Sequence, residues 1–398
     1  LDSEPFDSMP TNLLMENELM SLPHALKSIH FPADSQDAAN ARRRLAFDEL
    51  LILQLGMLTM KNHSREKTAY IMDKNTDMTA FFGSLPFEMT DAQKKSISDV
   101  INDMSTDSPM NRLLQGDVGS GKTAVAAAAC YFACQNGFQS ALMAPTEILA
   151  VQHYNTLKSF LEPIGVNVVL LTGSMTAKQK RIAKEALKSG ETAVAAGTHA
   201  IIQKDVEFQR LGLVITDEQH RFGVAQRAAL ADKGNSPHRL VMSATPIPRT
   251  LALIIYGDLD ISIINQMPKG RLPVKTYAVT GKLRKRAYNF IKSEIDNGRQ
   301  AYIVCPMIED SDSDLQAVKS YADKLRIDDF ADYEIGLLHG KMKAAEKNEI
   351  MSKFKDGKID LLVCTTVVEV GVDVPNASIM LIENAERFGL SQLHQLRG

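Results

Sequence analysis

Short apolar stretches alternate with longer segments of mixed polar and apolar residues through most of the chain, beginning near residue 85. The short stretches are typical of buried strands, and the longer segments are typical of amphipathic helices. Alternation of this kind predicts a parallel sheet covered by helices. The predicted strands of the first series are 112–115, 140–144, 168–172, 192–196, 211–216 and 239–242.

A second series of strands follows a break in this pattern. The segment 265–273 contains two prolines and a glycine, which is typical of a linker. Alternation then resumes, and we therefore expect an α/β fold with two tandem lobes, each built on a parallel sheet. The predicted strands of the second series are 274–278, 300–305, 334–338, 359–364 and 378–382.

Residues 1–84 differ from the rest because they lack β-rich alternation. Apolar residues from Leu45 to Met57 lie near helical spacing and predict a helix over 41–60. The three arginines at 42–44 could contact phosphates, but a solvated helix face is the commoner role of such a run, and we favour it. The predicted organisation is a helical linker segment (1–84), a first lobe (85–270) and a second lobe (271–398).

Composition narrows the class of protein without selecting a function. Of the 398 residues, 44% are hydrophobic and 23% are charged, which is typical of a globular chain. The net charge of −3 neither indicates nor excludes a nucleic-acid partner, because a narrow binding groove does not require a basic protein. The four cysteines form no C-x-x-C pair, which disfavours a zinc site or a disulfide framework.

The sequence predicts no attachment to a membrane. The longest apolar run, 124–134, is shorter than the ~18 residues that a membrane span needs. The acidic start from Leu1 to Glu4 lacks the positive charge of a signal peptide. We therefore expect a cytoplasmic protein, and the initial leucine in place of methionine indicates an excised fragment.

The strongest chemical signal is a phosphate-binding sequence. Residues 116–123, Gly-Asp-Val-Gly-Ser-Gly-Lys-Thr, fit the pattern G-x-x-x-x-G-K-[ST] after a predicted strand and before an Ala-rich helix. Gly116, Gly119 and Gly121 would let backbone N–H groups approach phosphates at a helix N-terminus. Lys122 would reach the β- and γ-phosphates of ATP, and Thr123 would bind Mg²⁺.

An acidic pair follows the strand predicted at 211–216. Asp217 would hold the Mg²⁺ shell, and Glu218 would polarise the attacking water. The tripeptide 243–245, Ser-Ala-Thr, follows another predicted strand, and its hydroxyls could bond to these carboxylates. One carboxylate and one hydroxyl suit a cation that keeps its waters, so Mg²⁺ is expected to enter with the nucleotide.

The second lobe has no phosphate-binding sequence of its own. It carries Leu338-His-Gly340 and then 364–373, Cys-Thr-Thr-Val-Val-Glu-Val-Gly-Val-Asp. The latter could belong to a functional site, but a buried strand followed by a capped helix explains the same residues about equally well. Taken by themselves, these residues leave both interpretations open.

In this order, the motifs resemble the superfamily 2 helicase motors, which have two RecA-like lobes with ATP between them. The segments 143–150, 217–223, 244–250, 365–375 and 383–398 narrow the resemblance to the RecG-type branched-DNA helicases of bacteria. This resemblance covers about residues 85–398, while residues 1–84 are similar to the segment that joins the wedge domain of that family to its motor. It implies ATP and Mg²⁺ as cofactors, and branched DNA such as forks and four-way junctions as the partner in repair and recombination.

The resemblance also implies the roles of further residues. Phe87 and Gln93 correspond to an adenine-reading motif, because a glutamine amide can satisfy both a donor and an acceptor of the adenine edge. In the DNA-contact motifs of the family, backbone amides and hydroxyls bind phosphates without reading sequence. The positions that correspond to those motifs are Pro145, Thr146, Thr172, Gly173, Gly197, Thr198, Thr365 and Thr366. Coupling positions are Gln219, His220, Ser243, Thr245 and Gln395, and the nucleotide-sensing positions of the second lobe are Gly371 and Asp373.

Three alternatives stand beside this interpretation. The transcription-repair coupling motor shares Thr-Pro-Ile-Pro-Arg-Thr but typically has Asp-Glu-Glu-His where this chain has Asp-Glu-Gln-His at 217–220. A metabolic kinase with a phosphate loop would lack a second lobe carrying 365–375. The third is a nucleotide- and DNA-binding module without turnover.

The third alternative depends on two departures from the family pattern. The final motif of the family reads Gln-x-x-Gly-Arg-x-Gly-Arg, and this sequence stops at Gln395-Leu-Arg-Gly398. The wedge domain of the family is also missing upstream. We therefore expect these 398 residues to bind ATP with slow turnover. We also expect the protein to be a monomer.

Overall fold

The computed structural model describes residues 6–65, 70–218, 233–234, 236–244, 259–268, 274–306, 312–365 and 374–397. These residues fall into two compact units, of which the first contains the N-terminal helices and the second contains two sheets. The fold is α/β, with parallel sheets of seven and four strands, and it confirms the predicted fold class. Within the described ranges, no helix combines the length and the apolar character needed to cross a membrane.

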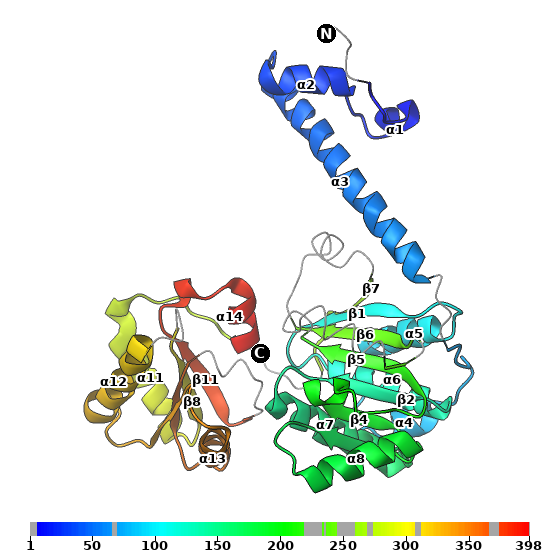
Figure 1. Ribbon diagram of the computed structural model, residues 1–398. Coiled ribbons are helices and arrows are strands. Elements are labelled where there is room, and N and C mark those ends of the chain that lie inside the picture. The colour runs from blue at the N-terminus through cyan, green and yellow to red at the C-terminus, as the bar shows by residue number, and fades with distance from the viewer. Residues whose placement is uncertain are drawn as a thin grey trace. The chain divides into compact units, whose positions relative to one another are not determined.

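The first unit contains α1 (Thr11–Glu16), α2 (Leu22–His30) and the long α3 (Ser35–Arg65) (Figure 1). Arg44 on α3 is only 1% exposed, and it forms ion pairs with Asp7 and Asp48. Its Nε also donates to the carbonyl of Met20 at 2.9 Å. The prediction of a solvated helix face is therefore wrong for Arg44, because protein acceptors take the place of water around its guanidinium group. Its neighbours Arg42 and Arg43 are exposed.

The first sheet has the spatial order β3-β4-β2-β5-β6-β1-β7, and its strands pair in parallel from β3 through β1. Parallel neighbours need long crossover connections, which the helices between these strands supply. The carboxyl ends of β1 to β6 consequently lie at one edge of the sheet. The strands are β1 (Asn111–Gly116), β2 (Gln139–Met143), β3 (Val168–Leu171), β4 (Val194–Gly197), β5 (Leu211–Asp217), β6 (His238–Ser243) and β7 (Asp260–Ile264).

Helices cover both faces of this sheet (Figure 1). Successive strand residues point to opposite faces, so Leu142 lies in one core while Ala141 and Met143 lie in the other. The central helix α6 is apolar on all sides and buried from Ala124 to Ala133. The first face carries α5 (Asp91–Met104), α6 (Lys122–Gln135) and α7 (Glu147–Leu161), and the second carries α8 (Ala177–Ser189) and the 3-10 turn η2 (His199–Ile202). The short helix α4 (Thr79–Ser84) precedes α5, and the 3-10 turn η1 (Glu162–Ile164) follows α7.

Local sequence determines where two of these helices begin. Thr90 caps α5 and Thr176 caps α8, each in a capping box with a glutamine three residues later. The hydroxyl of each threonine accepts a bond from a backbone N–H that has no partner inside the helix. The cap at Thr90 also places Gln93 in the first turn of α5, beside the phosphate-binding sequence.

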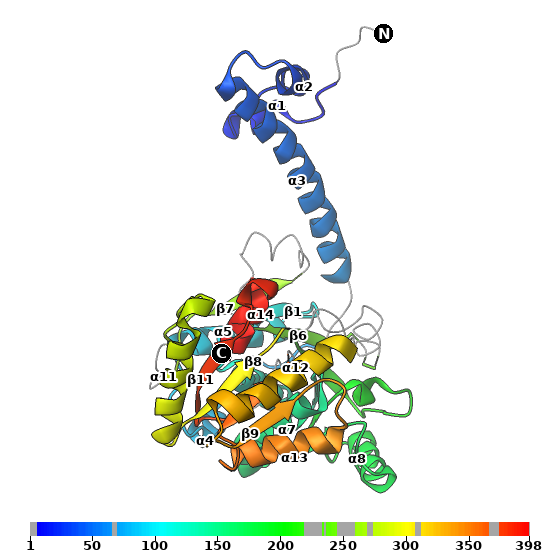
Figure 2. The ribbon, with the colours of Figure 1, turned by 90° about the vertical axis from the view of Figure 1, so that its left-hand side faces the viewer.

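The second sheet has the order β11-β8-β10-β9, and all its pairings are parallel. Its strands are β8 (Gln300–Val304), β9 (Ile335–Leu338), β10 (Leu361–Cys364) and β11 (Ala377–Ile382). One face packs on α11 (Arg284–Asp296) and α12 (Asp312–Lys324), and the other packs on α13 (Ala344–Lys355) and α14 (Leu390–Arg397) (Figure 2). Short turns are η4 (Gly281–Leu283), η5 (Leu325–Asp329) and η7 (Ala385–Arg387).

Two strand predictions differ from the structure. Residues 274–278 have no regular structure, and Val274 and Tyr277 are exposed. A strand needs a partner that completes its hydrogen bonds and covers one face, and no described strand pairs with this segment. The strand β7 was not predicted, because its apolar run is short and directly precedes the linker segment.

Candidate functional site

Three neighbouring strands of the first sheet end in the residues that the sequence predicts for nucleotide chemistry. β1 leads into the glycine-rich loop 116–121, β5 ends at Asp217, and β6 ends at Ser243. β6 lies between the other two, with Ser243 paired to Gln115 and Met242 paired to Asp217. The strand order therefore brings the phosphate loop and the acidic pair to the same edge of the sheet.

The glycine-rich loop turns sharply before α6. Gly119 and Gly121 have φ angles of 74° and 86°, in the left-handed region that favours glycine. A Cβ atom on Gly121 would lie 2.2 Å from Nε2 of Gln93, so the close approach of α5 also requires glycine here. The backbone at Gly121 is thus constrained both by its conformation and by its neighbour.

Lys122 and Thr123 occupy the first turn of α6, directly after this loop. The Nζ atom of Lys122 donates to the carbonyl oxygens of Gly116 and Asp117, at 2.8 and 3.0 Å. The ammonium group therefore lies at the loop, where a helix N-terminus already favours anions. The position of this charge suits a phosphate ligand.

Phe87 and Gln93 lie in different environments near the start of α5. Phe87 is 40% exposed, and its ring meets Phe160 edge to face. Gln93 is buried: its Oε1 accepts from the backbone N–H of Thr90, and its Nε2 donates to the carbonyl of Ser120 at 2.7 Å. The Gln93 amide thus joins α5 to the phosphate loop, and reading an adenine edge would require an exchange of these bonds.

Glu218 has an uncommon backbone conformation. Its φ is 50°, which few non-glycine residues adopt and which tends to occur at functional sites. Its N–H donates to the carbonyl of Met242, and its Oε1 accepts from the backbone N–H of Ala244 at 3.1 Å. The predicted link from the acidic pair to the hydroxyls of 243–245 stays a prediction, and the bond from Ala244 joins the same two segments through the backbone.

Asp217 is buried at the end of β5 and contacts a histidine that none of the sequence motifs includes. Its Oδ2 lies 2.7 Å from Nε2 of His153 on α7. A carboxylate only accepts hydrogen bonds, so Nε2 carries the hydrogen. A signal for this contact existed, because Ala150, His153 and Leu157 form the buried face of α7, and a buried polar side chain needs a partner.

The donor set at this edge fits Mg²⁺ that arrives with phosphates. In the described part of the chain, no three His, Cys, Asp or Glu side chains are grouped to hold a metal. Mg²⁺ commonly keeps several waters and binds through one or two carboxylates together with phosphate oxygens. The Asp217 carboxylate at the end of β5 and the Thr123 hydroxyl in the first turn of α6 would supply oxygen ligands of this type.

The strands β2, β3 and β4 end in the loops predicted to contact DNA, at 145–146, 172–173 and 197–198. Backbone hydrogen bonds join these loops to each other. The N–H of Ala144 donates to the carbonyl of Gly197 at 2.8 Å, and the N–H of Thr198 donates to Leu171 at 3.2 Å. The loops therefore lie next to one another at the carboxyl edge of the sheet, where β2 is the neighbour of β5.

Side chains hold the same loops in place. Thr146 caps α7, and Oε1 of Glu147 accepts from the backbone N–H of Ser174 at 2.9 Å. The hydroxyl of Thr172 lies 3.3 Å from that of Ser174. Oγ1 of Thr198 is buried and has no hydrogen-bond partner among the described residues.

Fewer predicted residues of the second lobe are described. Thr365 follows β10 and is fully buried, and its N–H donates to the carbonyl of Leu338 at 3.2 Å. Its Oγ1 has no partner within the described ranges. Gln395 lies in α14, but its side chain is outside the described part of the structure. The predicted site residues of either lobe that lie outside the described part of the chain are Gln219, His220, Thr245, Thr366, Gly371 and Asp373.

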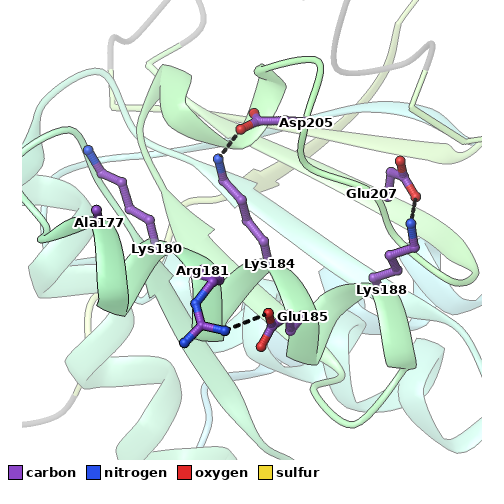
Figure 3. A pocket seen from close by; sticks show the side chains of 8 residues that line it. All are labelled: Ala177, Lys180, Arg181, Lys184, Glu185, Lys188, Asp205 and Glu207. Atoms are coloured by element: carbon purple, nitrogen blue, oxygen red, sulfur yellow. Dashed lines mark hydrogen bonds and ion pairs between the residues drawn. The ribbon is translucent and has the colours of Figure 1, made fainter.

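A surface hollow of about 400 Å³ lies along α8, and none of its lining residues belongs to the predicted site (Figure 3). Six of its charged side chains form ion pairs with each other, while Lys180 donates to the carbonyl of Gly173. The pairs are Lys184 with Asp205, Lys188 with Glu207, and Arg181 with Glu185. Exposed pairs of this kind contribute little energy, and the hollow gathers no set of groups suited to nucleotide chemistry.

Known proteins identify first the class and then the family of this chain. The DEAD/DEAH box helicase family matches residues 90–254, and the helicase conserved C-terminal domain matches residues 283–398. These matches fall on the two α/β lobes and assign them to the helicase class of domains.

More narrowly, the chain belongs to the RecG family of ATP-dependent DNA helicases. It is 48% identical to RecG of Synechocystis, over 98% of this chain and 48% of that protein. It is also 48% identical to RecG of Bacillus subtilis, over 100% of this chain and 58% of that protein. A solved structure of RecG bound to a three-way DNA junction is 42% identical, with a TM-score of 0.81, and covers 98% of this chain and 52% of that one. The chain thus spans about half the length of the curated relatives that it matches.

Proposed function

We propose that this chain works as an ATP-dependent DNA motor that remodels branched DNA, including stalled forks and four-way junctions. The observation that supports this most is the meeting of the phosphate loop, Asp217 and Glu218 at the ends of β1 and β5. It occurs in a chain that is 48% identical to ATP-dependent DNA helicases. A related RecG protein binds a three-way junction, which supports branched DNA as the substrate.

The nucleotide is bound by the first lobe. Phosphates of ATP replace the carbonyls of Gly116 and Asp117 as partners of Lys122, and backbone amides of the glycine-rich loop complete their binding. Phe87 stacks on the adenine ring, and Gln93 reads its edge. These contacts orient the γ-phosphate toward the acidic residues at the end of β5.

Thr123 and Asp217 hold the magnesium ion that accompanies ATP. When bound, this ion would supply positive charge that offsets the charge of the phosphates. Glu218 orients and polarises the attacking water. Because Glu218 also accepts a bond from Ala244, a change at the γ-phosphate is passed to the end of β6. Coupling to the second lobe then uses Ser243, Thr245, Gln219, His220, Gln395, Gly371 and Asp373.

The DNA backbone is bound by loops of both lobes. In the first lobe, the DNA backbone is contacted by Pro145, Thr146, Thr172, Gly173, Gly197 and Thr198. In the second lobe, it is contacted by Thr365 and Thr366. Contacts to phosphate and sugar position a protein on DNA without reading its sequence, which suits a motor that works at any branch point. We assign residues 1–84 as the linker segment, 85–270 as the first lobe and 271–398 as the second, in a cytoplasmic monomer that acts in repair and recombination.

The test compares ATP binding and hydrolysis without DNA, with linear duplex and with a three-way junction. A polypeptide of the 398 residues is expected to bind a fluorescent ATP analogue with Mg²⁺ but to hydrolyse ATP slowly. Arginine fingers contribute about 10³–10⁵ in rate, and those of the family's final motif are not among these residues. A polypeptide extended through that motif should show hydrolysis that a junction stimulates more than duplex does. Absence of ATP binding would contradict the proposed function, and rapid junction-stimulated hydrolysis by the 398 residues would contradict slow turnover alone.

A further inference from the structure

His153 lies between the candidate nucleotide residues and the candidate DNA-contact loops. It belongs to α7, which begins at Glu147 directly after the loop 145–146. Its Nε2 lies 2.7 Å from Oδ2 of Asp217, and the two side chains are only 9% and 11% exposed. This contact therefore joins two elements of the first lobe in a site that is largely closed to water.

The N-terminus of α7 is held by the loops predicted to contact DNA. Thr146 caps the helix, and Glu147 accepts from the N–H of Ser174 at 2.9 Å. Ser174 follows the predicted DNA-contact pair at 172–173 directly. His153 lies six residues after Glu147, or about 9 Å along the helix at 1.5 Å per residue. One short helix thus contacts two DNA-contact loops at its start and Asp217 further along.

We propose that His153 is a positioning residue that orients the Asp217 carboxylate for Mg²⁺ and ATP and links it through α7 to the DNA-contact loops. The proposal rests on the proposed function, since it assumes that Asp217 serves the metal. The bond from His153 engages Oδ2, so Oδ1 is the oxygen that Asp217 would offer to the ion. Partners of this kind, which hold a metal-binding group without touching the metal, commonly change metal affinity or activity by about 10–100-fold when they are removed.

The link through α7 follows from the same contacts. A shift of the loop at 145–146 or at 172–174 on binding DNA would move the first turn of α7. Because a helix of this length is stiff, His153 would move with it and change the orientation of Asp217. DNA binding would therefore alter the affinity for Mg²⁺ and ATP, and by thermodynamic reciprocity the nucleotide would alter the affinity for DNA.

The experiment measures equilibrium binding of a fluorescent ATP analogue as a function of Mg²⁺ concentration, with and without three-way junction DNA. Two variants break the contact with Asp217: His153→Leu removes the donor, and His153→Asn has an amide too short to reach the carboxylate. A third, His153→Gln, can place an amide N–H near the position of Nε2. The exposed residue Asn155 on the same helix provides the matched control, Asn155→Leu. Thermal unfolding of every variant reports whether it is folded.

The leucine and asparagine variants are expected to need about 10-fold more Mg²⁺ for half-maximal tightening of nucleotide binding. Junction DNA should change their nucleotide affinity much less than it changes that of the unaltered chain. His153→Gln should recover most of both effects, and Asn155→Leu should match the unaltered chain. If the leucine variant fails to fold, the asparagine variant decides, because it keeps a polar side chain of smaller volume.

A folded His153→Asn variant with unchanged Mg²⁺ dependence would overturn the positioning role. Glu147→Ala tests the link through α7, since it removes the contact to Ser174; if DNA then alters nucleotide affinity as before, the link is overturned. The proposed function fails separately, if the unaltered chain does not bind the nucleotide or if Lys122→Ala binds it equally well. If nucleotide binding depends on Lys122 but its Mg²⁺ dependence is unchanged in the His153 variants, this inference is overturned and the proposed function stands.

Discussion

The two halves of the carboxyl edge of the first sheet hold their polar groups in different ways. After β1, side chains bond back to the loop itself: Lys122 donates to the Gly116 and Asp117 carbonyls, and Gln93 donates to Ser120. After β2, β4 and β3, the backbone joins the loops, as in the bond from Ala144 to Gly197. In the first half, the side chains proposed to bind ATP are engaged in bonds to the loop itself. In the second half, the bonds that hold the loops are backbone bonds, which the proposed DNA contacts would not have to break.

This difference indicates that the two ligands are received differently. If ATP binds as proposed, it would have to exchange the internal bonds of Lys122 and Gln93, and its binding would include a local rearrangement at the start of α6. In the proposed function, the DNA backbone would meet loops that backbone bonds already hold together, so DNA could shift these loops as a unit without exchanging side-chain bonds. A motor needs both properties, because a rearranging site can report the state of the nucleotide while loops that move together keep their hold on the strand.

The largest effect is expected from Lys122→Ala, which should damage the nucleotide half alone. Loss of a charged hydrogen-bond donor costs about 1.5–3 kcal/mol, so affinity for ATP should fall by roughly 10–100-fold. Binding of junction DNA in the absence of nucleotide should be unchanged. Titration of a fluorescent ATP analogue and of labelled junction DNA measures both, with Lys188→Ala on the exposed side of α8 as the control. An equal loss of both affinities would show that the halves are not separate.

Gly197→Ala should damage the DNA-contact half. A Cβ atom at this position would lie 2.1 Å from the backbone oxygen of Leu171, so β3 and β4 would have to separate. Overpacking of this kind costs about 1–3 kcal/mol of folding free energy. Chemical unfolding measures that loss, and DNA binding should weaken while ATP affinity stays the same. Gly83→Ala is the control, since a Cβ atom there meets nothing within 4 Å. Unaltered stability of Gly197→Ala would contradict the description of loops held together by backbone bonds.

The smallest effect is expected from Thr198→Val, which removes a hydroxyl but keeps the shape of the side chain. Its Oγ1 is buried without a partner among the described residues, so valine should leave stability unchanged or slightly higher. Affinity for junction DNA should fall by about 2–10-fold, which corresponds to one neutral hydrogen bond. Fluorescence anisotropy at fixed salt measures this, with Thr156→Val on α7 as the control. A stability loss without any change in DNA affinity would indicate that the hydroxyl serves the fold.

Much of the fold could be predicted from the sequence, because strands buried on both faces appear as continuous apolar runs. The runs that became β1 to β6 and β8 to β11 show this directly. The segment 274–278 has a similar pattern but lacks a described partner strand, and pairing is not encoded in the segment itself. The predicted solvated environment of Arg44 was wrong for a related reason, since its hydrogen-bond acceptors on Asp7 and Met20 come from distant parts of the chain.

The chemistry of the candidate site was predictable where it depends on spacing, and less so where it depends on strand order. The eight residues 116–123 specify a phosphate loop by their own sequence. The contact of His153 with Asp217 joins residues that only the order of β2 and β5 brings together. The bond from Ala244 to Glu218 uses a backbone N–H, which the identity of a side chain does not reveal.

The order of strands along the chain also has a consequence for synthesis on the ribosome. β2, β3 and β4 follow one another between Gln139 and Gly197 and pair in one block, so this half can assemble as soon as it emerges. β1 emerges earlier but has to wait for β6, which begins only at His238. Chains fold from the N-terminus during synthesis, and long-range parallel pairing is slow. The surface proposed to hold DNA would therefore mature first, and a nascent chain could not bind ATP until the last strand of the nucleotide half had been added.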